Sequence, residues 1–290
     1  MSPETQKPQV LALLILLTVL ATSGCSIVVE KATDSFGTNL TSAILNQDDP
    51  ELVRDGMPAY ILLMDSLDEG NPDNPPTLSA AANLYASYGA VFVDDELRAK
   101  RLTSRARDYA LRAMCNTYTD SCDWRQLNYD DFVATLDGLT EKHAETVYIY
   151  GFATLAYLRA HSSDWNSMAE LPQAEALMKR YLEISGESAN ASAHTYLGVI
   201  LTILPPALGG KPEEARTHFE KAIALSGGRD LGAKIEFVKS YAKLLYDQEL
   251  HDQIVNEVLD ADPKADRLTL TNVLAQEEAL RLRAEASDYF

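Results

Sequence analysis

The sequence predicts an all-α fold, a solenoid of helical hairpins with about eleven to twelve helices. Three observations carry this prediction. Alanine and leucine are abundant among the 46% of residues that are hydrophobic, and no long stretch alternates β-branched and polar residues. Helix-capping residues and prolines divide the chain into segments of helical length. One pattern of small and aromatic residues recurs in pairs of expected helices.

The start of the chain is expected to lie outside the fold. Residues 10–22 read VLALLILLTVLAT, an apolar run that is too short for a stable bilayer-spanning helix and typical of a signal peptide. Small residues then precede Cys25. We interpret residues 1–24 as a lipoprotein signal peptide, residues 25–34 as a tether and residues 35–290 as a single α-helical repeat domain. An ordinary secretory signal with a chance cysteine is the alternative.

The residues around Cys25 resemble the bacterial lipoprotein signal, in which the cysteine thiol is acylated and becomes the new N-terminus. Thr22 departs from the pattern, because leucine is commoner at that position, and Glu4 offsets the charge of Lys7. Retention in the inner membrane usually goes with an aspartate after the cysteine, whereas Ser26 stands there. The resemblance therefore implies a lipid anchor on the periplasmic side of the outer membrane.

Local signals set the expected helix boundaries. An acidic cap followed by Pro50 starts one helix, and the segment 70–77, GNPDNPPT, ends it. Thr77 is expected to cap the next helix. Later, Gly227-Gly228 ends a helix because glycine tolerates the left-handed conformation, and Asp230 caps its successor. The expected helices are 35–45, 50–68, 78–93, 95–114, 129–139, 140–160, one from Pro172, 189–204, 212–226, a pair within 230–261, and 268–287.

The strongest repeat signature lies in residues 197–228. Ala215, Phe219 and Ala222 have the spacing found in the second helix of a tetratricopeptide repeat, where small residues let the paired helix approach and the aromatic ring fills the gap between hairpins. Gly198 is the matching small residue of the first helix. Gly198 and Ala215 lie about five residues further apart than in a standard repeat of about 34 residues.

Weaker hairpins of the same kind recur along the chain. Four degenerate repeats predict one continuous solenoid and not separate domains, because each hairpin buries its apolar face against the next. The further repeats are marked by Ala106-x3-Ala110-x2-Ala113, by Gly151 followed by Ala174-x3-Met178-x2-Tyr181, and by the hairpin that ends at Asp262-Pro263.

The extra residues between Gly198 and Ala215 form an apolar connection with two prolines and two glycines. Prolines fix the backbone and glycines permit tight turns, so we expect a rigid, shaped lip between two repeats. A segment with this many apolar residues must be buried or must face a partner. Two interpretations stay open: the lip lines a cavity or contacts another subunit, or it folds inward as a plug that completes the core. Its residues are Ile203, Leu204, Pro205, Pro206, Leu208, Gly209, Gly210 and Lys211.

The remaining cysteines are expected to be structural. Export would place Cys115 and Cys122 in an oxidising compartment. Two cysteines that lie this near to each other in the sequence are expected to form a disulfide there. A zinc pair would need a shorter spacing and further cysteine or histidine ligands nearby, which are absent. We therefore expect a disulfide and no metal site.

The sequence carries little catalytic chemistry. The five histidines are scattered along the chain, and neither a nucleophile elbow nor a phosphate-binding loop occurs. Asp95 and its acidic neighbours are better explained as helix caps than as general acids. We expect no enzymatic activity and no cofactor. The net charge of −18 also argues against a nucleic-acid partner, because an acidic chain repels phosphate backbones.

One family resemblance covers nearly the whole chain after Cys25. Residues 193–234, AHTYLGVILTILPPALGGKPEEARTHFEKAIALSGGRDLGAK, resemble the T component of TRAP (tripartite ATP-independent periplasmic) transporters, the TatT family. Residues 71–95, 245–263 and 268–290 fit the same family. The resemblance implies a periplasmic lipoprotein with a repeat-like helical fold. It also implies a homotrimer and a partnership with a TRAP-type substrate-binding protein, which hands an organic acid to an ion-driven permease of the inner membrane.

The leading functional interpretation is a non-enzymatic, lipid-anchored scaffold that docks a TRAP-type substrate-binding protein and assists the uptake of an organic acid or another small solute. The first alternative is a direct carrier that holds a small apolar or carboxylated ligand in a groove of the solenoid. The second is a repeat lipoprotein that takes part in envelope assembly.

Overall fold

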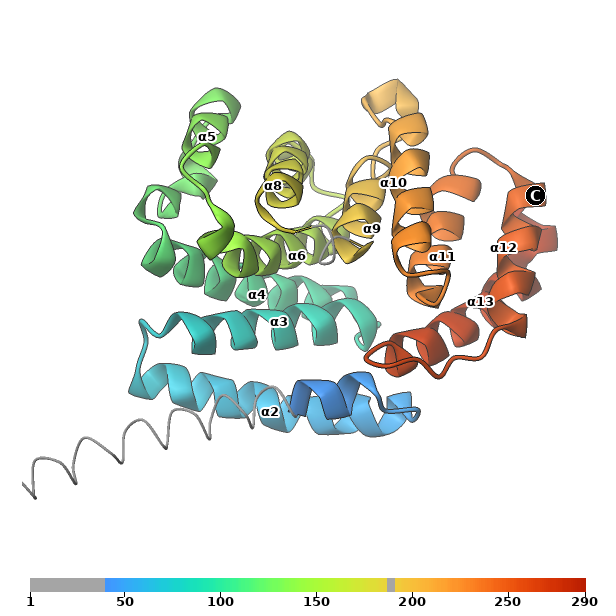
Figure 1. Ribbon diagram of the computed structural model, residues 1–290, viewed down its shortest axis with the longest axis horizontal. Helices are drawn as coiled ribbons and strands as arrows, with labels where there is room; N and C mark the ends of the chain where they lie inside the picture. Colours follow the sequence, from blue (N-terminus) through green and yellow to red (C-terminus); the bar gives the residue numbers. More distant parts are fainter. Residues whose placement is uncertain (1–39, 187–190) are drawn as a thin grey trace, which may run out of the picture.

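A computed structural model describes residues 40–186 and 191–290 of the chain (Figure 1). Within these residues the fold is all-α and solenoid-like, without strands, which confirms the predicted fold class. The expected signal peptide, tether and Cys25 lie outside the described residues. The α-helices are α2 (Pro50–Gly70), α3 (Pro75–Val91), α4 (Glu96–Thr117), α5 (Tyr129–Leu136), α6 (Ala144–Ala160), α7 (Trp165–Met168), α8 (Leu171–Ile184), α9 (Ala191–Ile200), α10 (Pro212–Leu225), α11 (Leu231–Phe237), α12 (Gln248–Asp260) and α13 (Thr269–Tyr289).

Several helices begin where the sequence predicts, because the capping side chains satisfy amide groups that the first turn leaves unpaired. The carboxylate of Asp95 accepts a hydrogen bond from the amide of Arg98 at 2.7 Å at the start of α4. Asp230 accepts one from the amide of Ala233 at 3.0 Å at the start of α11. These two carboxylates are helix caps, as expected.

The start of α3 differs from the prediction. Asn74, not Thr77, is the N-cap, and its side-chain oxygen accepts hydrogen bonds from the amide and the hydroxyl of Thr77 at 2.9 and 2.8 Å. Pro75 and Pro76 therefore lie inside the first turn. Proline is tolerated there because the first amide groups of a helix have no partner within the helix.

The end of α9 also differs. The sequence predicts a helix to Leu204, but α9 ends at Ile200, and residues 201–204 form turns. The short helix α7 was not predicted, because four residues are too few to show a helical period. Leu171, one residue before the expected Pro172, is the first residue of α8.

The helices follow one another in space as they do in the chain. In Figure 1, α2, α3 and α4 form successive layers, and α8, α9, α10 and α11 continue the array towards α12 and α13. The two ends of the array also meet. The side-chain oxygen of Asn46 accepts a hydrogen bond from the amide of Arg267 at 2.6 Å, and its amide group lies 3.3 Å from Asp266. The solenoid is therefore bent so that its first and last parts are in contact.

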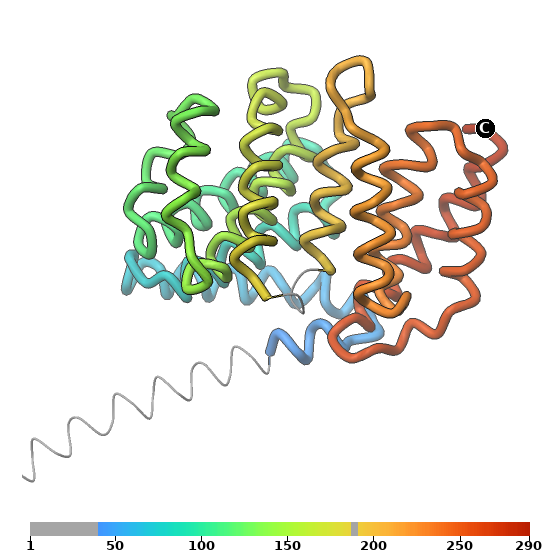
Figure 2. The backbone as a smooth tube through the Cα atoms, turned by 45° about the horizontal axis from the view of Figure 1, so that its top comes forward, coloured from blue at the N-terminus to red at the C-terminus, as the bar shows by residue number. Residues whose placement is uncertain are grey.

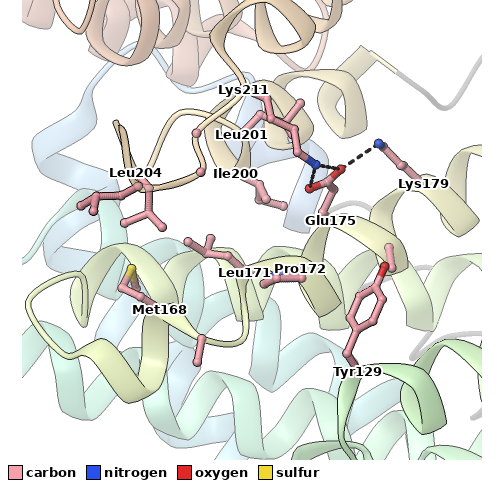
Figure 3. A pocket seen from close by; sticks show the side chains of 15 residues that line it. Tyr129, Met168, Leu171, Pro172, Glu175, Lys179, Ile200, Leu201, Leu204 and Lys211 are labelled. Atoms are coloured by element: carbon pink, nitrogen blue, oxygen red, sulfur yellow. Dashed lines mark hydrogen bonds and ion pairs between the residues drawn. The ribbon is translucent and has the colours of Figure 1, made fainter. Parts of the chain in front are cut away.

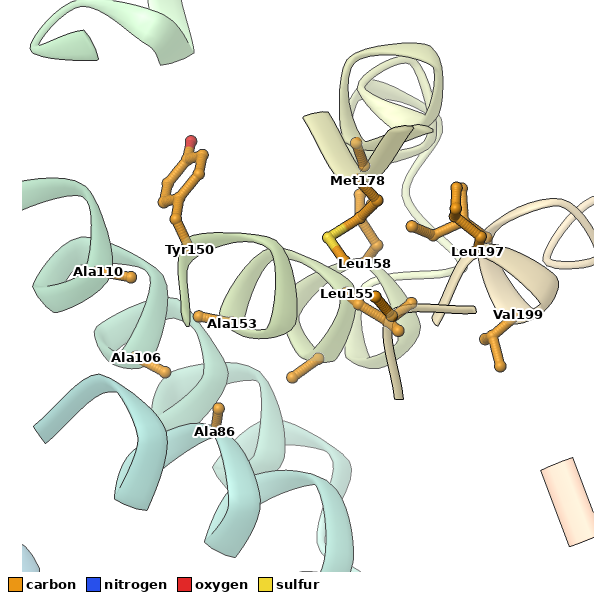
Figure 4. Close-up of a cluster of buried hydrophobic side chains, with 14 of the residues drawn as sticks. Ala86, Ala106, Ala110, Tyr150, Ala153, Leu155, Leu158, Met178, Leu197 and Val199 are labelled. Atoms are coloured by element: carbon orange, nitrogen blue, oxygen red, sulfur yellow. The ribbon is translucent and has the colours of Figure 1, made fainter. Parts of the chain in front are cut away.

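Small residues let the central helices pack closely. Ala86 of α3, Ala106 and Ala110 of α4, and Ala153 of α6 are all buried where these helices meet (Figure 4). Short side chains allow helix axes to approach, and larger side chains such as Leu158 fill the space between α6 and the next repeats. The alanines of the pattern that begins at Ala106 therefore lie where α4 contacts α3 and α6.

Candidate functional site

The connection between α9 and α10 is a closed, hydrogen-bonded loop. The amide of Lys211 donates to the carbonyl of Leu201 at 2.8 Å, and the amide of Gly210 donates to the carbonyl of Pro205 at 3.1 Å. Gly209 has φ +100°, a backbone conformation that favours glycine. A Cβ atom on Gly210 would collide with the carbonyl oxygen of Leu204. The two glycines therefore allow the loop to fold back tightly on itself.

The eight residues predicted to form a lip lie partly on the core and partly in solvent. Ile203 and Leu204 are half-buried and pack against the core, whereas Pro205, Pro206 and Leu208 are exposed. The side chain of Leu208 is 52% exposed, so it does not fill the interior. We call residues 203–211 the lip.

A pocket with a volume of about 430 Å³ lies beneath the lip. Binding sites for small molecules commonly have volumes of about 300–1,000 Å³ and mostly apolar walls. Figure 3 shows apolar side chains from α7, α8, the end of α9 and the lip facing this pocket. These apolar walls comprise Met168, Leu171, Pro172, Ile200, Leu201, Leu204 and Leu208, with Tyr129 at the start of α5.

Charged side chains line the other part of this lip pocket. The Nζ atom of Lys211 lies 2.8 Å from both carboxylate oxygens of Glu175, and the Nζ atom of Lys179 lies 2.8 Å from one of them (Figure 3). Lys179 also pairs with Glu214 of α10 at 2.7 Å. We call these four residues the ion-pair quartet, and its formal charges sum to zero.

Glu175 and Lys179 remain ionised at neutral pH. Partial burial acts to raise the pKa of Glu175, but its bonds to Lys179 and Lys211 outweigh this effect and lower the pKa. Burial acts to lower the pKa of Lys179, yet its two carboxylate partners raise the pKa above the ordinary value. The lip pocket thus combines apolar walls with Glu175, Lys179 and Lys211, while Glu214 lies outside the lining and pairs with Lys179.

Two histidines that seemed scattered in the sequence meet in the fold. The Nδ1 atoms of His194 in α9 and His218 in α10 lie 2.7 Å apart. Burial, then the neighbouring His218 and Lys221, lowers the pKa of His194 to about 4. Burial also lowers the pKa of His218. A hydrogen bond at this distance needs one ring to donate and the other to accept, which two neutral rings can do.

The residues of the repeat signature lie at the contact between α9, α10 and α11. Gly198, Ala215, Phe219 and Ala222 are all buried. The ring of Phe219 stacks on that of Phe237 in α11, with 5.2 Å between centroids. The signature therefore lies between one hairpin and the next helix.

The two internal cysteines meet at the end of α4. Cys115 and Cys122 are joined by a disulfide, and their Cα atoms are 4.5 Å apart. The chain then turns so that Trp124 is buried, and its indole nitrogen donates a hydrogen bond to the hydroxyl of Thr135 at 2.8 Å. The disulfide thus lies at the start of the loop that leads to α5.

Two kinds of feature are absent from the described part of the chain. Residues 40–186 and 191–290 contain no cluster of three or more side chains suited to binding a metal ion. No helix among these residues has both the length and the apolar character that crossing a bilayer requires.

The fold and the lip pocket define a class of protein: an α-helical solenoid with a small, mostly apolar pocket between two of its hairpins. The comparison with protein families gives a more specific result. Residues 46–290 match the family described as TRAP transporter T-component, and the chain belongs to this family. A comparison with curated proteins gave no match. The family gives the chain a role in TRAP transport, in association with other components of the transporter at the bacterial envelope.

Proposed function

We propose that this chain is a non-enzymatic, lipid-anchored scaffold on the periplasmic side of the outer membrane. Its role would be to dock a TRAP-type substrate-binding protein and to assist the uptake of an organic acid or another small solute. The family match over residues 46–290 is the observation that carries this proposal. Cys25 is the proposed lipidation site, and a homotrimer is the proposed assembly.

An exposed apolar edge beside the lip pocket is the proposed docking surface. Leu208 and Tyr129 line the pocket and are 52% and 49% exposed, and Trp165 of α7 is 67% exposed. The lip, the start of α5 and the segment before α8 lie along one side of the molecule (Figure 2). Exposed aromatic and leucine side chains around a hollow are typical of protein-protein contacts, in which tryptophan and tyrosine contribute much of the binding energy.

Docking can be tested by sedimentation of the full chain in lipid nanodiscs with the TRAP-type substrate-binding protein of the same organism. We expect a complex of fixed stoichiometry. The substitutions Trp165→Asp and Leu208→Asp should weaken it, because each places a charge in the proposed contact. Leu97→Asp is the matched control, since Leu97 is an exposed leucine (73%) at the start of α4, outside the proposed surface. The docking proposal fails if no complex forms, and its proposed surface fails if all three variants bind alike.

The lip pocket favours a second function, that of a carrier which holds the solute itself. Its volume of about 430 Å³ suits a small molecule, and its walls join an apolar region to Glu175, Lys179 and Lys211 of the ion-pair quartet. In this proposal the lip residues 203–211 form one wall of the ligand site. Equilibrium dialysis of small solutes against the chain without its partner would separate a carrier from a scaffold, because only a carrier binds solute alone.

A further inference from the structure

The lip pocket contains a charge arrangement that restricts the chemistry of its ligand. Glu175 lies between Lys179 and Lys211, and Lys179 continues to Glu214. The carboxylate of Glu175 is well covered, whereas Lys211 and Lys179 keep nearly half of their side-chain surface exposed. Long lysine side chains on the surface can swing aside at little cost, so the quartet can open towards a ligand.

Ligands with a single charge fit this arrangement poorly. Because Glu214 pairs with Lys179 and Glu175 with Lys211, a monoanion would add an uncompensated negative charge beside Glu175, in a chain whose net charge is already −18. A monocation would compete with Lys179 and Lys211 and leave an excess of positive charge. A purely apolar molecule would fit the walls but gain no polar contact at the quartet.

We propose that the lip pocket binds a small zwitterion with an apolar body, of the class of the apolar α-amino acids. The ligand carboxylate would pair with Lys211 and the ligand ammonium group with Glu175. One ion pair of the protein is thereby exchanged for two pairs with the ligand, and the charges still sum to zero. The apolar body would lie against Leu171, Ile200 and Leu204. This inference rests on the carrier function proposed above and names its substrate class.

The test uses the full chain in lipid nanodiscs and radiolabelled L-leucine in equilibrium dialysis. Two competitors keep the branched apolar body of leucine and only one of its charges: 4-methylpentanoate is the anion and 3-methylbutylamine the cation. We expect leucine to bind about tenfold or more tightly than either, because each analogue loses a charge-assisted pair. Equal binding of the anion, or no binding of any of the three, overturns the inference.

Two variants of α8 separate ligand contact from a structural effect. Glu175→Gln should weaken leucine binding about tenfold and should strengthen binding of 4-methylpentanoate, because the carboxylate that repels it is gone. Glu183→Gln, which removes a carboxylate of the same helix outside the pocket, should change neither. If Glu175 had only a structural role, Glu175→Gln would weaken the binding of both ligands. That result would contradict the proposal.

Docking is measured on the same samples so that the two proposals fail separately. Formation of the complex with the substrate-binding protein, without leucine binding, overturns the inference about the pocket and leaves the docking proposal intact. Leucine binding without complex formation overturns the docking proposal and leaves the inference about the pocket intact.

Discussion

The ring of Phe219 lies directly against the backbone of Gly198. A Cβ atom added to Gly198 would lie 2.7 Å from Cζ of Phe219 and 2.8 Å from two further ring carbons. This distance is shorter than van der Waals contact, so α9 and α10 can pack in this way only if residue 198 is glycine. The preceding repeat also packs closely at a glycine. A Cβ atom on Gly151 of α6 would collide with the sulfur of Met178 in α8.

The two glycines should respond differently to replacement by alanine. Alanine favours a helix over glycine by about 0.5–1 kcal/mol. At Gly198 the rigid, stacked ring of Phe219 cannot move away, and we expect a net loss of about 1–2 kcal/mol in the free energy of unfolding. At Gly151 the flexible Met178 can adjust, so the change should be near zero. Urea unfolding of Gly198→Ala and Gly151→Ala measures both, and equal losses would contradict this explanation.

Substitutions in the lip should distinguish an exposed wall from a buried plug. Leu208 is half exposed, so Leu208→Ala should change the free energy of unfolding by less than about 0.5 kcal/mol. Leu201 beneath it is 3% exposed, and Leu201→Ala should cost about 2–4 kcal/mol through the cavity it leaves. Chemical denaturation of the two variants is the measurement. A large loss for Leu208→Ala would mean that the lip completes the core.

Removal of the carboxylate that pairs with the buried Arg107 should strongly destabilise the fold. Arg107 of α4 is 3% exposed, its guanidinium group binds both carboxylate oxygens of Glu170, and it lies 4.6 Å from the centre of the Tyr157 ring. Glu170→Gln would leave a buried charge without its counter-ion, which costs about 3–5 kcal/mol. Glu51→Gln breaks the exposed pair with Arg54 and serves as the control, with no measurable change expected.

The His194–His218 pair should make stability depend on pH. Because the pKa of His194 is lowered from 6.5 to about 4, the unfolded chain takes up a proton first as the pH falls. Stability is therefore full above pH 6.5 and decreases between pH 6.5 and about 4. His194→Gln should flatten this decrease, measured as melting temperature against pH. An unchanged slope in the variant would show that other groups cause the pH dependence.

The disulfide between Cys115 and Cys122 closes a short loop, so its effect should be modest. We expect the double substitution Cys115→Ser and Cys122→Ser to lower the free energy of unfolding by about 2 kcal/mol. Wild-type protein in reductant should show the same loss, and the variant should not respond to reductant. If reductant leaves the free energy of unfolding of the wild-type protein unchanged, this bond contributes nothing to stability.

The helices and most of their boundaries were predictable because the signals that set them are local. Asp95 and Asp230 bond amides three residues ahead, so the information lies within a single turn. The sequence predicts Thr77 as the cap of α3, because threonine is a common capping residue. Asn74 takes that role because two prolines can enter the first turn after it.

The lip pocket could be predicted only in part. Prolines and glycines indicated a rigid apolar connection, and the structure places a pocket under it. The ion-pair quartet was not predicted, because it joins Glu175 and Lys179 of α8 to Lys211 and Glu214 at the start of α10, and no local sequence signal links these two segments. The meeting of His194 and His218 was missed for the same reason.

The sequence by itself determined the all-α class, the order of the helical hairpins, the small and aromatic residues of the repeat contact and the family. These properties follow from helical periodicity, from caps within one turn and from residue spacing. The tertiary structure alone decided which side chains meet: the exposed and buried halves of the lip, the ion-pair quartet, the histidine pair and the contact between Asn46 and Arg267. Such contacts depend on how consecutive hairpins bend and stack, and that geometry arises from many packed residues together.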